Sequence, residues 1–232
     1  MKCAPGEVHV WRIDLDFAAK TATMLRTTLS PEEKQRASRF RSVELRERWT
    51  AARGALRCIL AGYAGCEPDL LVFREGPHGK PALTWASEDI PFNLSHTGGL
   101  ALVAIAGVGR VGIDAETVRP EIEVEDLSRR FFAPAEAAAI LALPSNARLA
   151  AFLNCWTRKE AFVKALGGGL SVPLDSFQVS VRSDELARLL WVNGEGPDQW
   201  SMWDVSEPGV AAALVVEGHV PVLQRMNFVP QV

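Results

Sequence analysis

The stretch IAGVGRVGIDAE, residues 105–116, distinguishes two different folds. Its three glycines have the G-x-G-x-x-G spacing of a dinucleotide-binding turn, which requires a strand before it and a helix directly after it. An apolar run precedes the glycines, but residues 110–116 alternate with a period of two and Pro120 follows, which indicates a second strand instead of a helix. We therefore interpret residues 107–110 as the turn of a β-hairpin, in which glycine supplies a positive φ.

The second strand of this hairpin carries two acids on one face. Asp114 and Glu116 are two residues apart, so their side chains share a face with Gly112 and their Cα atoms lie about 6.5–7 Å apart. We expect the glycine to keep the space beside them open. Hard cations such as Mg²⁺ prefer carboxylate oxygens, so the pattern fits a metal site and equally fits two solvated acids on an edge strand. The opposite face is apolar and consists of Val111, Ile113 and Ala115.

Length and composition indicate a folded protein with a sizeable core. The chain has 232 residues, of which 48% are hydrophobic, enough for one large domain or two small ones. It contains no apolar run of membrane-spanning length and does not begin like a signal peptide, so we expect a cytoplasmic protein that neither enters a membrane nor is exported. The four cysteines lack C-x-x-C spacing, which argues against a zinc site and a disulfide framework and favours free thiols.

Charge is distributed unevenly along the chain. Residues 34–57 hold eight basic and two acidic residues, although the net charge of the whole chain is −3. Such a basic stripe is either a solvated helix face or a binding site for phosphates. The overall negative charge and the few aromatic residues beside the stripe argue against nucleic acid as a partner.

The pattern of apolar and helix-capping residues predicts alternating strands and helices. Ser30 followed by Pro31 is typical of a helix start, with serine as the N-cap and proline in the first turn. Turn-rich residues 76–81 separate two short predicted strands. The predicted strands are 8–16, 70–73, 82–85, 100–106 and 110–116, and the predicted helices are 31–40, 44–63 and 147–166.

Several residue pairs recur about a hundred positions later. Ile13-Asp14 returns as Ile113-Asp114, Ser30-Pro31 as Ala133-Pro134, and Trp49-Thr50 as Trp156-Thr157. Unless these matches are coincidental, they predict an α+β protein of two related halves, residues 1–106 and 107–232, which form a pseudo-dimer in one chain. A pseudo-dimer of this kind is expected to be a monomer, with its ligand in the cleft between the halves.

The predicted helix 147–166 carries charges in or beside its apolar face. On a helical projection Lys159 falls inside the buried arc, and Glu160 and Lys164 fall at its edge. An ion pair between Glu160 and Lys164 would explain those two residues. It does not explain Lys159, because burying an unpaired charge is costly.

Together these residues resemble the Sfp-type 4′-phosphopantetheinyl transferases. The family signatures are a G-[IV]-D-x-E strand and a W-x-x-K-E-[AS]-x-x-K helix, which stand here as residues 112–116, GIDAE, and 156–164, WTRKEAFVK. The likeness extends to LSPEEKQRASRF, GPHGKP, FNLSH, RRFFAPAE and VPLDSF, and so covers most of residues 29–177. The resemblance implies the 4′-phosphopantetheinyl transferase-like fold, two pseudo-twofold-related α+β halves with coenzyme A between them.

The resemblance also implies a role for each matching residue. Asp114, Glu116 and Glu160 correspond to the ligands of a Mg²⁺ cofactor that bridges to the coenzyme A diphosphate. Glu160, directly or through a water, corresponds to the acceptor of the serine proton, a role that metal ligation opposes by lowering basicity. Lys164 is the second catalytic residue, and we favour charge stabilisation over proton donation because a leaving phosphate is a weak base. The implied coenzyme contacts are Arg48, Arg53, Lys80, Ser95, His96, Lys159 and Lys164.

The implied reaction transfers the phosphopantetheine arm of coenzyme A to a serine of an acyl or peptidyl carrier protein, as in polyketide or nonribosomal peptide synthesis, and releases 3′,5′-ADP. Phosphoryl transfer of this kind depends mainly on positioning and charge neutralisation. Two alternatives remain open at this point. One is a non-catalytic relative that binds coenzyme A or another nucleotide, and the other is a Mg²⁺-dependent phosphohydrolase.

Overall fold

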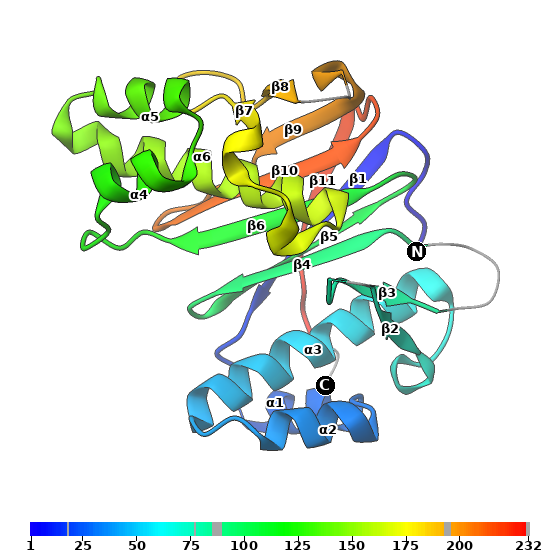
Figure 1. The fold of residues 1–232 in the computed structure, drawn as a ribbon. Helices are drawn as coiled ribbons and strands as arrows, with labels where there is room; N and C mark the ends of the chain where they lie inside the picture. Colours follow the sequence, from blue (N-terminus) through cyan, green and yellow to red (C-terminus); the bar gives the residue numbers. More distant parts are fainter. Residues whose placement is uncertain (18, 77, 85–89, 193–195, 231–232) are drawn as a thin grey trace.

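Two β-sheets pack face to face, with one long helix on the outer side of each sheet (Figure 1). This arrangement is seen in a computed structural model that describes residues 1–17, 19–76, 78–84, 90–192 and 196–230. The first half contains β1 Glu7–Asp14, α1 Ala19–Thr27, α2 Pro31–Ser38, α3 Val43–Ala64, β2 Phe73–Glu75, β3 Pro81–Leu83, β4 Phe92–Thr97 and β5 Leu100–Ala106. The second half contains β6 Val111–Thr117, α4 Val124–Phe131, α5 Pro134–Leu141, α6 Ser145–Leu166, β7 Phe177–Val179, β8 Leu189–Val192, β9 Trp200–Asp204, β10 Val210–Glu217 and β11 Val222–Asn227.

The two halves share one topology, and the α+β class is confirmed. The first sheet includes the order β1-β5-β4, and the second has the order β6-β10-β9, with antiparallel neighbours in both cases. The helices α3 and α6 are both 22 residues long, and each ends at a glycine with positive φ, Gly65 or Gly167. Both α2 and α5 begin with a proline. In each helix, a glutamate in the first turn accepts a hydrogen bond from the backbone N–H of the residue just before the helix. The predicted repeat of elements is therefore present in three dimensions, but the predicted match of Trp49 with Trp156 is wrong, because counted from these two glycines the counterpart of Trp156 is Gly54.

The predicted hairpin between β5 and β6 is wrong. Strand β5 pairs with β1 and β4 in the first sheet, whereas β6 pairs with β10 in the second. Gly109 supplies the expected positive φ of 80°. Gly107 is needed for another reason, because a Cβ there would lie 1.9 Å from the carbonyl oxygen of Ala4. The connection between β5 and β6 is therefore the crossing point between the sheets.

The last strand returns to the first half. Strand β11 runs parallel to β1, with Val8 opposite Leu223 and Trp11 opposite Met226. Phe228, just beyond it, packs against the core of the first half. The predicted division after residue 106 assigns β11 to the second half, whereas its hydrogen bonds place it in the sheet of the first. The division elsewhere stays a prediction.

Two other predictions differ locally from the structure. The short strands predicted at 70–73 and 82–85 are β2 and β3, displaced by up to three residues, and Trp85 lies outside the described residues. Helices α1, α4 and α5 and strands β4 and β7 to β11 are absent from the predicted elements. In the part of the chain that the structure describes, no helix combines the length and apolar character needed to cross a membrane.

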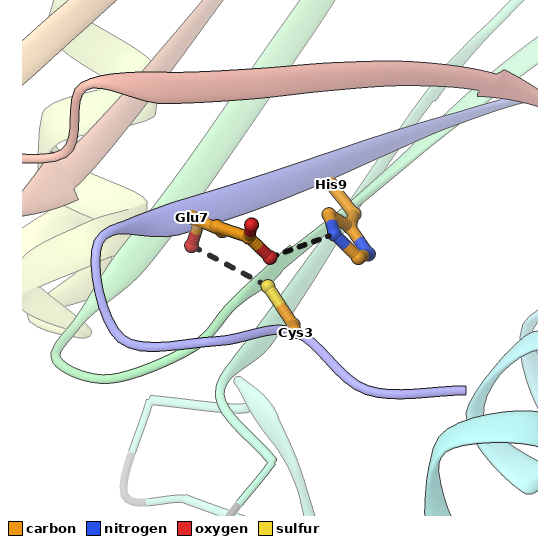
Figure 2. Close-up of side chains that lie close together, drawn as sticks. All are labelled: Cys3, Glu7 and His9. Carbon is orange, nitrogen blue, oxygen red and sulfur yellow. Dashed lines mark hydrogen bonds and ion pairs between the residues drawn. The ribbon is translucent and has the colours of Figure 1, made fainter.

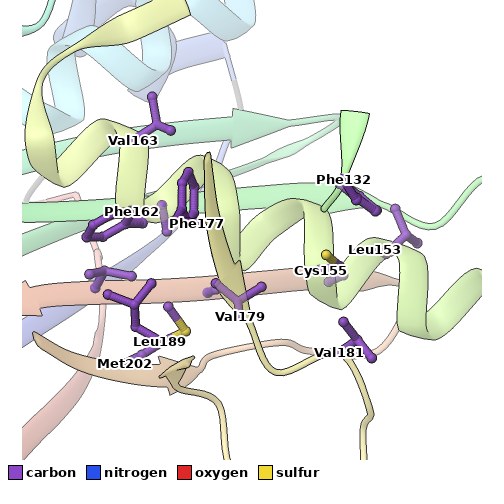
Figure 3. Close-up of a cluster of buried hydrophobic side chains, with 14 of the residues drawn as sticks. Phe132, Leu153, Cys155, Phe162, Val163, Phe177, Val179, Val181, Leu189 and Met202 are labelled. Carbon is purple, nitrogen blue, oxygen red and sulfur yellow. The ribbon is translucent and has the colours of Figure 1, made fainter. Parts of the chain in front are cut away.

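Strand alternation divides the apolar side chains among three cores. Odd-numbered residues of β5 pack with α3, and its even-numbered residues pack between the two sheets with β6 and β10. The third core lies between α6 and the outer face of the second sheet. Figure 3 shows part of it, in which the rings of Phe162 and Phe177 have centroids 4.8 Å apart. The central strands β5 and β10 are therefore buried on both faces, whereas the edge strand β11 is largely exposed.

Candidate functional site

The two faces of β6 are used as the alternation predicts. Its apolar residues Val111, Ile113 and Ala115 lie in the core between the sheets. Gly112 faces α6, and a Cβ at this position would lie 2.0 Å from the carbonyl oxygen of Ala161. The glycine does not keep a space open, which corrects the expectation. It lets the backbone of α6 approach β6, and this brings the acids of both elements together.

Replacing Gly112 by alanine is expected to separate α6 from β6. The added methyl group meets backbone atoms of α6, which cannot move without shifting the helix, so we expect a loss of at least about 1–3 kcal/mol in the free energy of unfolding. Urea unfolding measures this loss. Gly62→Ala in α3 is the matched control, because nothing lies within 4 Å of its added Cβ. Equal stability of both variants would contradict this role for Gly112.

Side chains of β4 bind the free edge of β6. Asn93, Ser95 and Thr97 point toward the second sheet. Their side-chain oxygens accept the backbone N–H groups of residues 113, 115 and 117 at 2.9, 3.2 and 3.0 Å. Three side chains thereby replace a neighbouring strand and join the two halves beside the acids. Asn93 and Thr97 are not among the predicted site residues, although their alternation with Ser95 in the sequence is a signal that points to them.

Asp114 is buried at the centre of this junction, with 4% of its surface exposed. Its Oδ1 accepts from Ser95 Oγ at 3.1 Å and forms an ion pair with Lys164 Nζ at 2.7 Å. Its Oδ2 is buried and has no hydrogen-bond partner among the residues that the structure describes. Because an unpaired buried carboxylate oxygen is costly, this atom suits direct contact with a cation.

Glu116 and Glu160 share the charged surroundings of Asp114. Burial raises the pKa of Glu116, and the neighbouring Asp114 charge adds to the effect. Burial likewise raises the pKa of Glu160, with contributions from Asp114 and Glu116. The three predicted acids are therefore neighbours, although their oxygens do not all lie within 4.8 Å of one another. Three oxygen ligands of this type fit a hard cation such as Mg²⁺.

Lys80 connects the first half to this site. Its Nζ donates to the carbonyl oxygens of Val111 at 2.9 Å and Lys164 at 2.7 Å. Burial lowers its pKa to about 8, and the charge of Arg110 contributes in the same direction. A lysine of the first half therefore secures the start of β6 and the end of α6.

A cavity of about 1030 Å³ lies beside α3 in the first half. We call it the basic groove; its basic lining residues are Arg36, Arg39, Arg53, Arg57, Arg74 and His96, and its acidic ones are Glu32, Glu33, Asp69 and Glu75. Arg53 pairs with Glu33, and its guanidinium lies 4.0 Å from the centre of the Phe73 ring. Burial lowers the pKa of His96, and the Lys164 cation contributes. His96 and Ser95 are adjacent in β4, so they face the groove and the acids respectively.

A second cavity, of about 550 Å³, lies at α6. We call it the apolar cavity; its walls include Phe131, Trp156, Val163, Val172 and Leu174. Glu160, Lys164 and Lys80 also line it. The basic groove and the apolar cavity share Gly79, Pro81 and Leu94 as wall residues, so they adjoin. A ligand with a charged part and an apolar part fits across this boundary.

Two predicted coenzyme contacts lie away from these cavities. Arg48 pairs with Asp16 at 3.0 Å and with Glu44 at 2.6 Å, and it does not line the basic groove. Lys159 has 0% of its side chain exposed and pairs with Glu136 at 2.8 Å. Its Nζ also donates to the carbonyl oxygens of Leu174 and Phe177, both at 2.6 Å. The expectation that Lys159 reaches phosphate is therefore wrong, because its charge is satisfied inside the second half.

The first half contains the same arrangement at Arg57. This side chain is 2% exposed, pairs with Glu33 at 2.6 Å, and donates to the carbonyl oxygens of Pro68 and Leu71. Glu33 and Glu136 occupy the same position in the first turn of α2 and α5. Lys159 is thus the repeat counterpart of Arg57. Glu33 recurs as Glu136 in the sequence. This recurrence is the signal that could have identified Lys159 as the partner in a buried ion pair.

Comparisons of the sequence with known proteins identify a family. Residues 110–215 match the family model of the 4′-phosphopantetheinyl transferase superfamily. The chain is 39% identical to the 4′-phosphopantetheinyl transferase HetI of Nostoc sp. over 215 residues, 91% of this chain and 88% of that protein. It is 29% identical to the 4′-phosphopantetheinyl transferase Sfp of Bacillus subtilis, over 80% of this chain and 81% of that protein. A holo-[acyl-carrier-protein] synthase structure from Thermotoga maritima aligns with 47% of this chain and 62% of its own, at 25% identity and a TM-score of 0.38.

Proposed function

Because this chain belongs to the 4′-phosphopantetheinyl transferase superfamily, we propose that it transfers the phosphopantetheine arm of coenzyme A to a serine hydroxyl of an acyl or peptidyl carrier protein. The proposal includes Mg²⁺ as the cofactor and 3′,5′-ADP as the second product. The observation that carries it is the unpartnered Oδ2 of buried Asp114, beside two further acids and next to Lys164. A monomeric state and a cytoplasmic location stay predictions.

The two adjoining cavities match the two parts of coenzyme A. We assign the phosphate-bearing nucleotide to the basic groove, where Arg53 and His96 face the ligand. We assign the phosphopantetheine arm to the apolar cavity, which Glu160 and Lys164 border. The diphosphate then lies near the boundary, beside Lys80 and the acids.

Mg²⁺ held by Asp114, Glu116 and Glu160 would neutralise the diphosphate and stabilise the charge of the transition state. Lys164 stabilises the negative charge that develops on the leaving 3′,5′-ADP. Its ammonium is held at the site by the ion pair with Asp114. Glu160 accepts the proton of the carrier serine, directly or through a water; burial raises its pKa in the metal-free protein, whereas Mg²⁺ bound to the same carboxylate would lower its basicity. Ser95 orients Asp114 and Lys164 by hydrogen bonds to both.

Incubation of the purified chain with coenzyme A, Mg²⁺ and an apo carrier protein tests this proposal. Mass spectrometry of the carrier is expected to show the added phosphopantetheine arm on serine, and chelation of Mg²⁺ is expected to prevent it. Cleavage of coenzyme A without a carrier would indicate a phosphohydrolase instead. Binding of coenzyme A without any cleavage, across several carriers, would indicate a non-catalytic relative.

Affinity for coenzyme A is expected to fall as the pH rises through about 8. The pKa of Lys80 in the free protein is about 8, and a bound phosphate would favour its charged form, so binding weakens where the free lysine loses its proton. The coenzyme phosphates are already ionised there, with a second pKa of about 6. Calorimetric titrations at several pH values measure this trend. In Lys80→Met the decline above pH 8 should disappear; an identical decline would remove Lys80 from the phosphate site.

A further inference from the structure

Cys3, Glu7 and His9 form a cluster outside the two cavities and away from the acids at Asp114. One potential ligand atom from each, a thiol sulfur, a carboxylate oxygen and an imidazole nitrogen, lies within 4.8 Å of the other two. Figure 2 shows the carboxylate of Glu7 between the Cys3 and His9 side chains. The Nε2 of His9 lies 3.7 Å from Glu7 Oε2, beyond hydrogen-bonding distance.

His9 carries the second observation that indicates a ligand. The residue is 3% exposed, and its buried Nε2 finds no hydrogen-bond partner in the described part of the chain. Its other ring nitrogen, Nδ1, lies 2.5 Å from the hydroxyl of Tyr63, which also accepts from Trp11 Nε1 at 3.0 Å. In metal sites a histidine commonly bonds through one nitrogen while the other donates to a neighbouring group. The Tyr63 hydroxyl can accept from Nδ1–H, which leaves the Nε2 lone pair available.

The backbone holds Cys3 in place for this cluster. The N–H of Glu7 donates to the carbonyl oxygen of Ala4 at 3.0 Å, and Gly107 packs closely against the same carbonyl. The N–H of Ala4 in turn donates to Glu7 Oε2 at 3.1 Å. The thiol contacts the carbonyl oxygens of Glu7 and Ile105 at 3.4 and 3.5 Å. The three side chains are therefore brought together by a short turn fixed against β5.

We propose that Cys3, Glu7 and His9 bind one Zn²⁺ ion, separate from the acidic site at Asp114. Sulfur, imidazole nitrogen and carboxylate oxygen together are typical of zinc, and three protein ligands leave a fourth position for water. Mg²⁺ prefers oxygen ligands alone and is not expected here. On binding, the Cys3 S–H bond breaks, a sulfur–zinc bond forms, and the proton goes to solvent. The ion joins the segment before β1 to β1 itself.

Titration of the metal-free full chain with Co²⁺, a spectroscopic substitute for Zn²⁺, tests this proposal. We expect an absorption band from thiolate-to-cobalt charge transfer that saturates at one ion per chain. One equivalent of Zn²⁺ should abolish the band, whereas excess Mg²⁺ should not. Co²⁺ bound at the Asp114 site has only oxygen ligands and gives no such band, so the result does not depend on the proposed transferase activity.

Matched variants assign the band to these residues. Cys3→Ser is expected to remove it, while Cys66→Ser, which changes another half-buried free thiol, keeps it. His9→Gln and Glu7→Gln should keep the band but weaken cobalt binding by about 10-fold or more. Circular dichroism of the metal-free variants verifies their fold. If Cys3→Ser does not fold, the cobalt affinities of His9→Gln and Glu7→Gln test the proposal instead. Absence of the band in the wild-type chain, its persistence in Cys3→Ser, or unchanged affinity in both glutamine variants would overturn the proposal.

Discussion

Replacing Asp114 by asparagine is expected to lower the rate of carrier loading by at least about 100-fold. Loss of residues that merely support a metal ligand costs about 10–100-fold, and a direct ligand should cost more. Asparagine keeps the size of the side chain and can still accept from Ser95 and Lys164, so the fold is expected to persist. Loading rates at several Mg²⁺ concentrations, followed by mass spectrometry, measure the effect.

Asp14→Asn is the matched control for this experiment. Asp14 occupies the equivalent place in the first half, at the end of β1, where it is exposed and its Oδ1 accepts from the N–H of Asp16. The same chemical change there is expected to leave loading unaltered. Wild-type turnover in Asp114→Asn, with unchanged dependence on Mg²⁺, would remove Asp114 from the metal site.

Replacing Lys159 by methionine is expected to lower the free energy of unfolding by about 3–5 kcal/mol. The substitution leaves the Glu136 carboxylate buried without its cation, and breaking one partner out of a buried ion pair has a cost of this size. The carbonyl oxygens of Leu174 and Phe177 lose their donor as well. Urea unfolding followed by circular dichroism measures the loss.

A double variant that combines Lys159→Met with Glu136→Gln identifies the cause of this loss of stability. If the unpaired carboxylate destabilises Lys159→Met, the double variant should be more stable than the two single effects predict, by at least about 1 kcal/mol. Lys34→Met, on the exposed face of α2, is expected to change stability by less than about 0.5 kcal/mol. A Lys159→Met chain with wild-type stability and a raised KM for coenzyme A would instead restore Lys159 to the phosphate site.

Local patterns were sufficient to predict α3, α6, β1 and the faces of β6, but not β10, which is as long as β1. Alternation placed Asp114 and Glu116 on one face, and a helical projection placed Lys159 inside the buried arc of α6. The partner of Lys159 could not be predicted in the same way, because Glu136 comes from another helix and meets it only after α5 packs on α6. The same reasoning could predict the pairing of Arg48 with Glu44, four residues earlier in α3, but not its pairing with Asp16, which lies 32 residues away.

The sequence by itself determined the two-half organisation, through residues that recur about a hundred positions later, and the strand character of residues 110–116 with Asp114 and Glu116 on one face, because periodicity acts over a few neighbouring residues. Only the tertiary structure decided that β5 and β6 belong to different sheets, that β11 returns to β1, and that Gly112 serves the approach of α6. Those features depend on which surfaces pack together. Packing joins residues that are far apart in the chain, so no local pattern specifies it.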